Sequence, residues 1–443
     1  MSLVIDGTTG FLASGTTSIY ANGAIQGSSI AAGTITGTQF SYINSISSSS
    51  SLTFFTGSNS IVFGSDASIS NNTGNLNLND SNVTVSSNLQ VGGNLTVIGN
   101  VTATTMQVSS VYLSPYASLR NRLHNGDMRI AQRNAYGTLQ SRSITSSTAV
   151  PAGSYYGNNI YAIDRWFCVA VGGTATIAQV AGTGSTQYRA QVTGGVSMTS
   201  MYYGQRIEQA NSYDLAGTTC TLSVDLSNSI LTAVTYTISY ANSADAFGTI
   251  GTPTKTTITT GSWTVSSSLA RYSVTVSVPA TATTGIEILF SVGAQTSGTW
   301  VIGNAQFEQG AVVTPFDRRP YTTELQLCQR YCPAWQATAI NQMVGQGGGY
   351  SSTIMGMVYQ FPVAARIPPT TAYPLVSSVA HFTVYTAATS SLGTVSGQSG
   401  GYSSIYSNLS FWTVSSGVTA GQVGYVVANT ATAFLYWDGC EIP

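Results

Sequence analysis

A six-residue repeat constrains the fold of this chain more than any other feature. In the tract NLQVGGNLTVIGNVTATT, asparagine recurs at Asn88, Asn94 and Asn100, and apolar residues alternate with polar ones between them. This alternation predicts β-strands, and the intervening glycines supply turn conformations that β-branched residues rarely adopt. Each unit carries one narrow apolar edge, so a single copy of the tract has nothing to bury that edge against.

We therefore predict that three parallel copies of residues 75–119 wind around a common axis as an intertwined triple-stranded β-shaft with a linker. The three copies would enclose the Leu and Val rows and pair strand edges that are otherwise open to aggregation. A β-solenoid made by one chain is the alternative, but it needs more turns than this segment holds. The predicted fold class is thus all-β, in an elongated homotrimer.

Composition excludes several classes of partner. Charged residues make up 7% of the 443 residues, the formal net charge is -1, and Lys255 is the single lysine. Without a basic stripe to release counterions, a nucleic-acid partner is not expected. Nowhere do 18 apolar residues follow one another, so membrane insertion is not expected. The start, MSLVIDGTTGFLASG, lacks the pattern of a signal peptide.

The five cysteines are scattered, with no spacing typical of a metal site or a disulfide framework. We expect buried free thiols and synthesis in a reducing cytoplasm. The residues concerned are Cys168, Cys220, Cys328, Cys332 and Cys440.

Changes in composition divide the chain further. Residues 1–74 are Ser- and Gly-rich, too polar for a core of their own, and we expect them to fold against partners. Short alternating runs separated by turn residues predict an antiparallel jelly-roll domain at 120–320. A helical connector is predicted at 321–335, with Thr323 as N-cap, Gln326 completing a capping box, and a proline as its stop.

The remaining residues, 336–443, are predicted to form a β-rich tip, the candidate receptor-binding domain. GQGGGYSS at 345–352 is echoed by GQSGGYSS at 397–404, and the two segments present Tyr350 and Tyr402. Flexible glycine beside tyrosine and serine is typical of adaptable recognition loops. The alternative is a hairpin turn used twice in a duplicated scaffold, and the two interpretations are compatible.

Catalysis is not expected. No two acids form a short motif of the kind that glycoside hydrolysis requires, and the two histidines, His124 and His381, are not accompanied by a nucleophile elbow. We therefore predict that the protein is not an enzyme.

Four tracts resemble bacteriophage tail fibres, or receptor-binding proteins. LVIDGTTG with SIAAGTITGTQ resembles their virion-attachment ends, and the asparagine repeat resembles their trimeric shafts. LHNGDMRIAQRN with YAIDRWF, and NAQFEQGAVVTPFDRRPYTTELQLCQRY, resemble a jelly-roll module of phage fibres that is similar to carbohydrate-binding modules. The resemblance covers residues 1–40 and 75–335. The tip, 336–443, resembles such fibres only in the general character of its sequence.

The resemblance implies a fibre located in the virion, anchored through residues 1–74 to a tail or baseplate protein, that binds a host-surface glycan or protein through its distal domains. A capsid-mounted fibre or decoration protein without a dedicated receptor is the alternative. A polysaccharide-degrading tailspike is less favoured, because the chain has no room for the large central β-helix that such fibres usually carry.

The resemblance and the composition together suggest binding residues. Aromatic side chains that could stack on sugar rings are Tyr350, Tyr402, Tyr406 and Trp412 in the tip and Tyr202, Tyr203, Trp263 and Trp300 in the jelly roll. No cofactor is expected, although modules similar to this jelly roll often hold a structural calcium ion. Oxygen ligands for that ion could come from Asn125, Asp127 and Glu308.

Overall fold

The computed structural model describes residues 85, 88–91, 97, 119–137, 139, 141–144, 161–184, 186–386 and 393–443. The predicted virion-attachment region, 1–74, lies outside them, as does most of the predicted shaft. The chain divides into two compact units, Met1–Thr104 and Thr105–Pro443, and every helix and strand named below belongs to the second. Among the described residues, no helix combines the length and the apolar character needed to cross a membrane.

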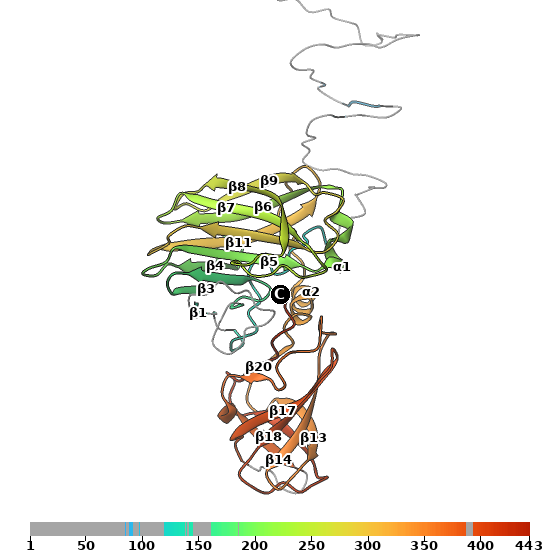
Figure 1. The fold of residues 1–443 in the computed structure, drawn as a ribbon. Coiled ribbons are helices and arrows are strands. Elements are labelled where there is room, and N and C mark those ends of the chain that lie inside the picture. Colours follow the sequence, from blue (N-terminus) through green and yellow to red (C-terminus); the bar gives the residue numbers. More distant parts are fainter. Residues whose placement is uncertain are drawn as a thin grey trace, which may run out of the picture. The chain divides into compact units, whose positions relative to one another are not determined.

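Two antiparallel sheets pack face to face in the first part of this unit (Figure 1). The six-stranded sheet has the order β1-β3-β4-β11-β6-β9, and the five-stranded sheet has the order β2-β5-β10-β7-β8. The strands are β1 Ser141–Ile144, β2 Phe167–Val171, β3 Ala175–Ala181, β4 Tyr188–Thr193, β5 Ser200–Ile207, β6 Thr219–Asn228, β7 Ala233–Ala241, β8 Lys255–Thr264, β9 Ala270–Ser277, β10 Ile286–Val292 and β11 Thr299–Gln309.

Alternating side chains build the core between these two sheets. In β3, Ala175 and Ile177 are buried in the core while their neighbours remain partly exposed. Trp166 stacks on Tyr203 with ring centroids 5.1 Å apart. Apart from the hairpins β3–β4 and β7–β8, consecutive strands lie in different sheets, so most connections cross the sandwich, as in a jelly roll. The structure confirms the predicted all-β class with antiparallel sheets of jelly-roll type.

Helices are few. A short helix α1 (Gln209–Ser212) and a 3-10 turn η1 (Tyr213–Leu215) follow β5, and the longer helix α2 (Tyr321–Gln329) follows the sandwich. The predicted helix therefore exists, but the predicted N-cap is wrong, because Thr323 lies inside α2. Its N-cap is Pro320, which makes no side-chain capping hydrogen bond. The carbonyl of Pro320 accepts the first hydrogen bond of the helix from the Glu324 N–H at 3.1 Å, and the expected capping box is not formed.

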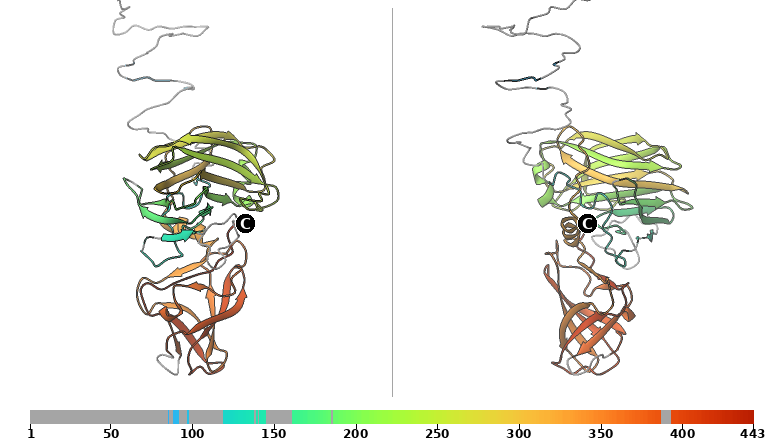
Figure 2. Two further views of the ribbon diagram at one scale, coloured as in Figure 1. Left: turned by 60° about the vertical axis from the view of Figure 1, so that its left-hand side comes forward. Right: turned by 180° about the vertical axis from the view of Figure 1, so that it is seen from behind.

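Two further antiparallel sheets, built from β12 to β20, form the C-terminal part of this unit, coloured orange to red in Figures 1 and 2. We call this C-terminal part the distal part. The small sheet has the order β12-β20-β15, and the large one has the order β16-β19-β13-β14-β18-β17. The elements are β12 Ala334–Gln336, β13 Met343–Gly349, β14 Ile354–Gln360, β15 Leu375–Val376, η2 Val379–His381, β16 Phe382–Thr386, β17 Gly397–Ser403, β18 Ser407–Thr413, β19 Val423–Ala428 and β20 Phe434–Tyr436.

Buried ion pairs join the last residues of the chain to the sandwich. The Arg133 guanidinium contacts Asp164 at 2.7 Å and Asp438 at 3.2 Å, and Arg165 pairs with Glu441. All five side chains are buried. Desolvation raises the pKa values of Asp164 and Glu441, while the neighbouring arginines oppose the rise. The predicted domains 120–320 and 336–443 both lie within the second compact unit, and the boundary between them stays a prediction.

The main chain reinforces this junction. The Phe247 N–H donates to the carbonyl of Pro443 at 3.1 Å, and Arg206 donates to the carbonyl of Ile442 at 3.2 Å. Phe247 and Ile442 also share a small apolar cluster with Tyr331 and Ala241. The five cysteines are buried free thiols, as the sequence predicts.

Candidate functional site

One face of the large distal sheet packs on a core and the other face is open. Met355, Met357 and Trp412 point into the core, and alternation directs their neighbours Gly356 and Phe411 to the opposite face. On that face the strand register places Gly356 beside Phe411, and Val358 beside Leu409. The open face is therefore apolar and aromatic over two adjacent strands.

A hollow of about 480 Å³ lies on this open face, and we call it the tip hollow. Its walls carry Tyr350 and Tyr402, whose exposed fractions are 70% and 77%. The ring of Tyr350 contacts that of Phe411 at a centroid distance of 5.1 Å. The full set of lining residues is Gly347, Gly348, Tyr350, Gly356, Val358, Tyr402, Leu409 and Phe411.

Glycine gives the tip hollow its floor. Gly348 and Gly356 are direct partners across β13 and β14, so no side chain rises between them. At Gly347, a β-carbon would lie 1.7 Å from the carbonyl oxygen of Gly356, which only glycine avoids. The floor is consequently main chain, open to a flat ligand from above.

A β-bulge places Tyr402 on the open face. Ser399 pairs with Phe411, and without a bulge the residue opposite Leu409 would be Gly401. The extra residue shifts the register by one, so that Tyr402 takes this position. A β-carbon at Gly401 would lie 1.5 Å from the Leu409 carbonyl oxygen, so the bulge depends on glycine.

The two echoed segments thus meet in one place. Tyr350 follows β13 at the turn into β14, where its N–H donates to the carbonyl of Ile354 at 2.8 Å. Tyr402 comes from β17, on the far side of β18 from β14. The two segments lie largely in β13 and β17, the first strands of two hairpins in one sheet, and their tyrosines line one hollow. Their role in recognition stays a prediction.

The other predicted tip residues lie elsewhere. Tyr406 is 63% exposed in the turn between β17 and β18 and does not line the hollow. Trp412 is buried, packs against Phe382 at 5.2 Å between ring centroids, and donates its Nε1–H to the Ser410 hydroxyl at 2.9 Å. Its prediction as a binding platform is wrong, because its ring is part of the core.

Among the jelly-roll candidates, Tyr203 and Trp300 are fully buried in the sandwich core and offer no face to a ligand. Trp263 is half-buried and packs against Tyr236 at a centroid distance of 4.5 Å. Tyr202 is half-buried against a satellite cluster of the core. The predictions for Tyr203 and Trp300 are therefore wrong, and the structure does not gather the four jelly-roll aromatics into one site.

The candidate calcium ligands are occupied by protein groups. The side-chain oxygen of Asn125 accepts from the Ile130 N–H at 2.9 Å, and Glu308 accepts from the Thr314 hydroxyl at 2.6 Å. Asp127 lies 3.4 Å from Arg129. Within the part of the chain that the structure describes, no group of three His, Cys, Asp or Glu side chains could hold a metal ion. The three residues thus have structural partners and do not form an oxygen cage.

Charge is scarce around the tip hollow. Between residues 337 and 437 the sequence contains a single charged residue, Arg366. Its guanidinium donates to the main-chain carbonyls of Cys440 and Glu441, at 2.7 and 2.6 Å, and so belongs to the junction. The hollow therefore suits an electrically neutral ligand.

Sequence reasoning missed Phe411, Leu409 and Val358. The signal was present, because SNLSFWT alternates as a strand does. This alternation predicts which residues share a face of the strand, but it does not predict which of the two faces is exposed to solvent.

Comparisons with known proteins give weak structural likenesses. No family model matches the chain, and no curated protein matches it in sequence. A CBM4 structure gives a TM-score of 0.27 at 14% identity, covering 42% of this chain and 98% of that one. TmCBM61 in complex with β-1,4-galactotriose gives 0.23 at 11% identity, covering 43% and 99%.

A further likeness is to the enzymatically active domain of tailspike protein 4 of bacteriophage CBA120. Its TM-score is 0.24 at 15% identity, and the match covers 45% of this chain and 22% of that one. Likenesses with TM-scores this low carry no argument about ligand or activity. The fold described above is drawn from strand order and pairing alone.

Proposed function

We propose that the protein is a fibre-type adhesin that binds a neutral glycan on a host surface through the tip hollow. One observation carries this proposal: Tyr350 and Tyr402, separated in sequence but placed in equivalent segments, line the same uncharged hollow. Aromatic rings present a flat apolar face to the C–H face of a pyranose, while their hydroxyls bond to those of the sugar. Main-chain glycine between the rings leaves space for the sugar to lie flat.

Binding without cleavage is part of this proposal. Glycoside hydrolysis uses two carboxyl groups on either side of the scissile bond. The residues that line the tip hollow are glycine, tyrosine, phenylalanine, valine and leucine, so this lining supplies neither of the two carboxyl groups.

The biological setting that we propose is a phage virion. It is supported by the resemblance of four sequence tracts to tail fibres, with residues 1–74 as the attachment region for a tail or baseplate protein. A weak single-site contact would suffice there, because several hollows on one particle raise the overall affinity by avidity.

A glycan array with the full-length protein tests the function. We expect binding to one or more neutral glycans, and a loss of affinity of about tenfold in Tyr350→Ala and in Tyr402→Ala, because each removes one stacking platform. Tyr406→Ala is the matched control, since it removes another exposed tyrosine, 63% exposed, that lies outside the hollow.

Two results would contradict the proposal. One is an unchanged array profile for both hollow variants, provided that circular dichroism shows them to be folded. The other is shortening of a bound polysaccharide on incubation with the wild-type protein, which would show that the protein is an enzyme.

A further inference from the structure

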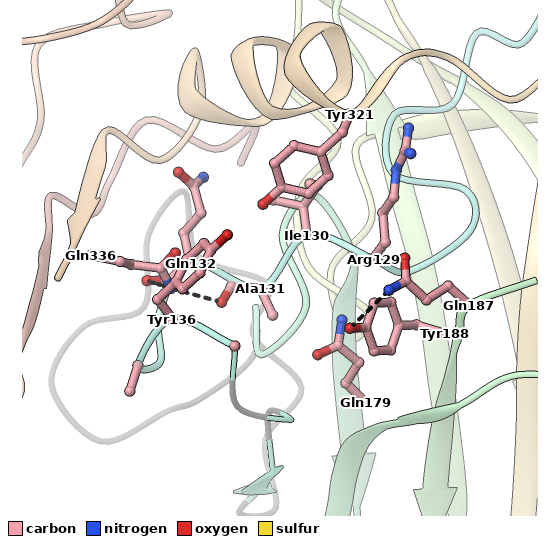
Figure 3. A pocket seen from close by; sticks show the side chains of 12 residues that line it. Arg129, Ile130, Ala131, Gln132, Tyr136, Gln179, Gln187, Tyr188, Tyr321 and Gln336 are labelled. Atoms are coloured by element: carbon pink, nitrogen blue, oxygen red, sulfur yellow. Dashed lines mark hydrogen bonds between the residues drawn. The ribbon is translucent and has the colours of Figure 1, made fainter. Parts of the chain in front are cut away.

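A second cavity lies beside the hairpin of β3 and β4, where residues 129–137 form much of its wall. It has a volume of about 300 Å³, at the lower end of the range for ligand pockets. We call it the glutamine pocket, and Figure 3 shows its side chains. Its lining residues are Arg129, Ile130, Ala131, Gln132, Ala135, Tyr136, Gly137, Gln179, Gln187, Tyr188, Tyr321 and Gln336.

Three of its four glutamines are held through their amide nitrogens. Gln179 donates to the carbonyl of Met128 at 2.7 Å, and Gln132 donates to the Asp164 carboxylate, also at 2.7 Å. Gln336, from β12, donates to the carbonyl of Ala131 at 3.3 Å. Because all three partners are acceptors, the nitrogen and oxygen ends of each amide are assigned without ambiguity.

Holding the nitrogen also fixes the oxygen, since the carboxamide group is planar. The side-chain oxygens of Gln132, Gln179 and Gln336 have no hydrogen-bond partner among the described residues. Gln132 and Gln179 are only 3% and 4% exposed, so their acceptors are held in a nearly buried wall. None of these oxygens is among the fully buried side-chain atoms that lack a partner, so they stay accessible in the pocket lining, where a ligand hydroxyl can donate to them.

Tyrosines form the rest of the wall. Tyr136 and Tyr321 are 55% and 47% exposed, and Tyr188 is half-buried with its hydroxyl 3.3 Å from the amide nitrogen of Gln187. In Figure 3, the ring of Tyr321, the first residue of α2, projects below the helix, and Tyr136 lies beside Gln132 and Gln336. Partial burial raises the pKa of Tyr321, so its hydroxyl stays protonated and can donate as well as accept.

The pocket carries little net charge. Of the described residues that line it, Arg129 has the one ionic side chain, and its Nε lies 3.4 Å from a carboxylate oxygen of Asp127. The same guanidinium donates to the Arg319 carbonyl, and its centre lies 5.7 Å from the centre of the Tyr321 ring. Its charge is thus already paired, and an anionic ligand would have to compete with Asp127.

We propose that the glutamine pocket is a second saccharide site, which takes about one or two rings of a neutral pyranose. Fixed amide oxygens accept from the sugar hydroxyls, and exposed tyrosine rings stack on the sugar face. This site shares no residue with the tip hollow, and its proposal does not depend on that of the hollow. Part of it comes from α2 and β12, so it exists only where the distal part meets the sandwich.

Saturation-transfer NMR and calorimetric titration of the full-length protein test the site. The probes are glucose, galactose, mannose, cellobiose and lactose, with glucuronate and sialyllactose as acidic counterparts. The background is the Tyr350→Ala/Tyr402→Ala double variant, which removes the tip hollow. In that background we expect millimolar binding of a neutral saccharide, weakened about tenfold by Tyr136→Ala and by Gln187→Ala.

Both substitutions change exposed side chains at the pocket rim, and so spare the buried amide bonds. Tyr406→Ala in the same background is the control and should leave binding unchanged. No neutral saccharide binding in the double variant, a preference for the acidic probes, or binding that is indifferent to Tyr136→Ala and Gln187→Ala would each overturn the proposal. None of these outcomes bears on the tip hollow, which is tested separately in the otherwise wild-type protein.

Discussion

His124 shows how a single residue depends on its surroundings. It is buried, its main chain exchanges hydrogen bonds with the Gln205 side chain at 2.7 Å in both directions, and its Nδ1 has no partner among the described residues. Desolvation lowers its pKa well below the usual 6.5, and the positive charges of Arg165, Arg319 and Arg330 lower it further. The folded state therefore holds a neutral ring.

This predicts a loss of stability on acidification. The unfolded chain takes up a proton near the ordinary pKa of histidine and the folded chain does not, so the stabilisation is present above about pH 6.5 and decreases below it. When the pH falls from 7.5 to 5.5, the unfolding free energy should decrease by about 1 kcal/mol because of His124. Denaturant titration at the two pH values measures this decrease. His124→Gln should lose this difference.

The comparison is between the wild-type protein and His124→Gln over the same range of pH. An identical pH dependence in wild type and His124→Gln would contradict the neutral, buried ring.

At the scale of elements, local pattern was enough to predict the strands of the sandwich. The runs CTLSVDLS, AVTYTISYA and IEILFSV correspond to β6, β7 and β10. Pattern was not enough for the binding surface. Phe411 and Trp412 are adjacent in β18, and only packing of the finished sheet decides that the tryptophan is buried and the phenylalanine open.

The glutamine pocket had no signal in the sequence for a different reason. Its residues come from four distant stretches of chain, and glutamine is common on surfaces. The packing of the C-terminal segment against the sandwich could not be predicted either, because an ion pair between Arg165 and Glu441 leaves no pattern in the local sequence. Long-range contacts of this kind follow from tertiary structure alone.

The C-terminal segment after β20 should be held mainly by its buried charges. Glu441→Gln leaves the guanidinium of Arg165 buried without its carboxylate, and removal of one partner from a buried pair costs about 3–5 kcal/mol. Asp214→Asn is the matched control, because it breaks an exposed pair with Arg122, and such pairs contribute about 0–1 kcal/mol. The measurement is the unfolding free energy in denaturant.

Equal losses in the two variants would show that the junction does not depend on its ion pairs. In that case the apolar cluster around Phe247 and Ile442 would hold the segment.

For the whole molecule, self-association remains our proposal. In the described residues of the asparagine repeat, apolar side chains are exposed in the single chain: Leu89 is 68% exposed and Val97 is 45% exposed. Exposed rows of apolar side chains favour association with further copies of the same chain, because association buries them. The homotrimeric β-shaft predicted at 75–119 would provide that burial.

Electrophoresis in detergent tests the assembly. We expect an interlocked β-trimer to migrate as a trimer without heating and as a monomer after boiling. The double variant Leu89→Asp/Val91→Asp should run as a monomer in both conditions, because charge in the seam opposes burial. Val196→Asp changes an 83% exposed apolar residue of the sandwich and should behave as wild type. A monomeric wild-type protein before heating would count against the shaft.

The absence of charge around the tip hollow has a consequence for the speed of attachment. Dissolved salt screens long-range attraction between ions, and here there is none to screen. Encounter with a neutral receptor then proceeds at the unsteered rate, on the order of 10⁵–10⁶ M⁻¹s⁻¹. The association rate of such an adhesin with its receptor would therefore be the same at low and at high salt concentration.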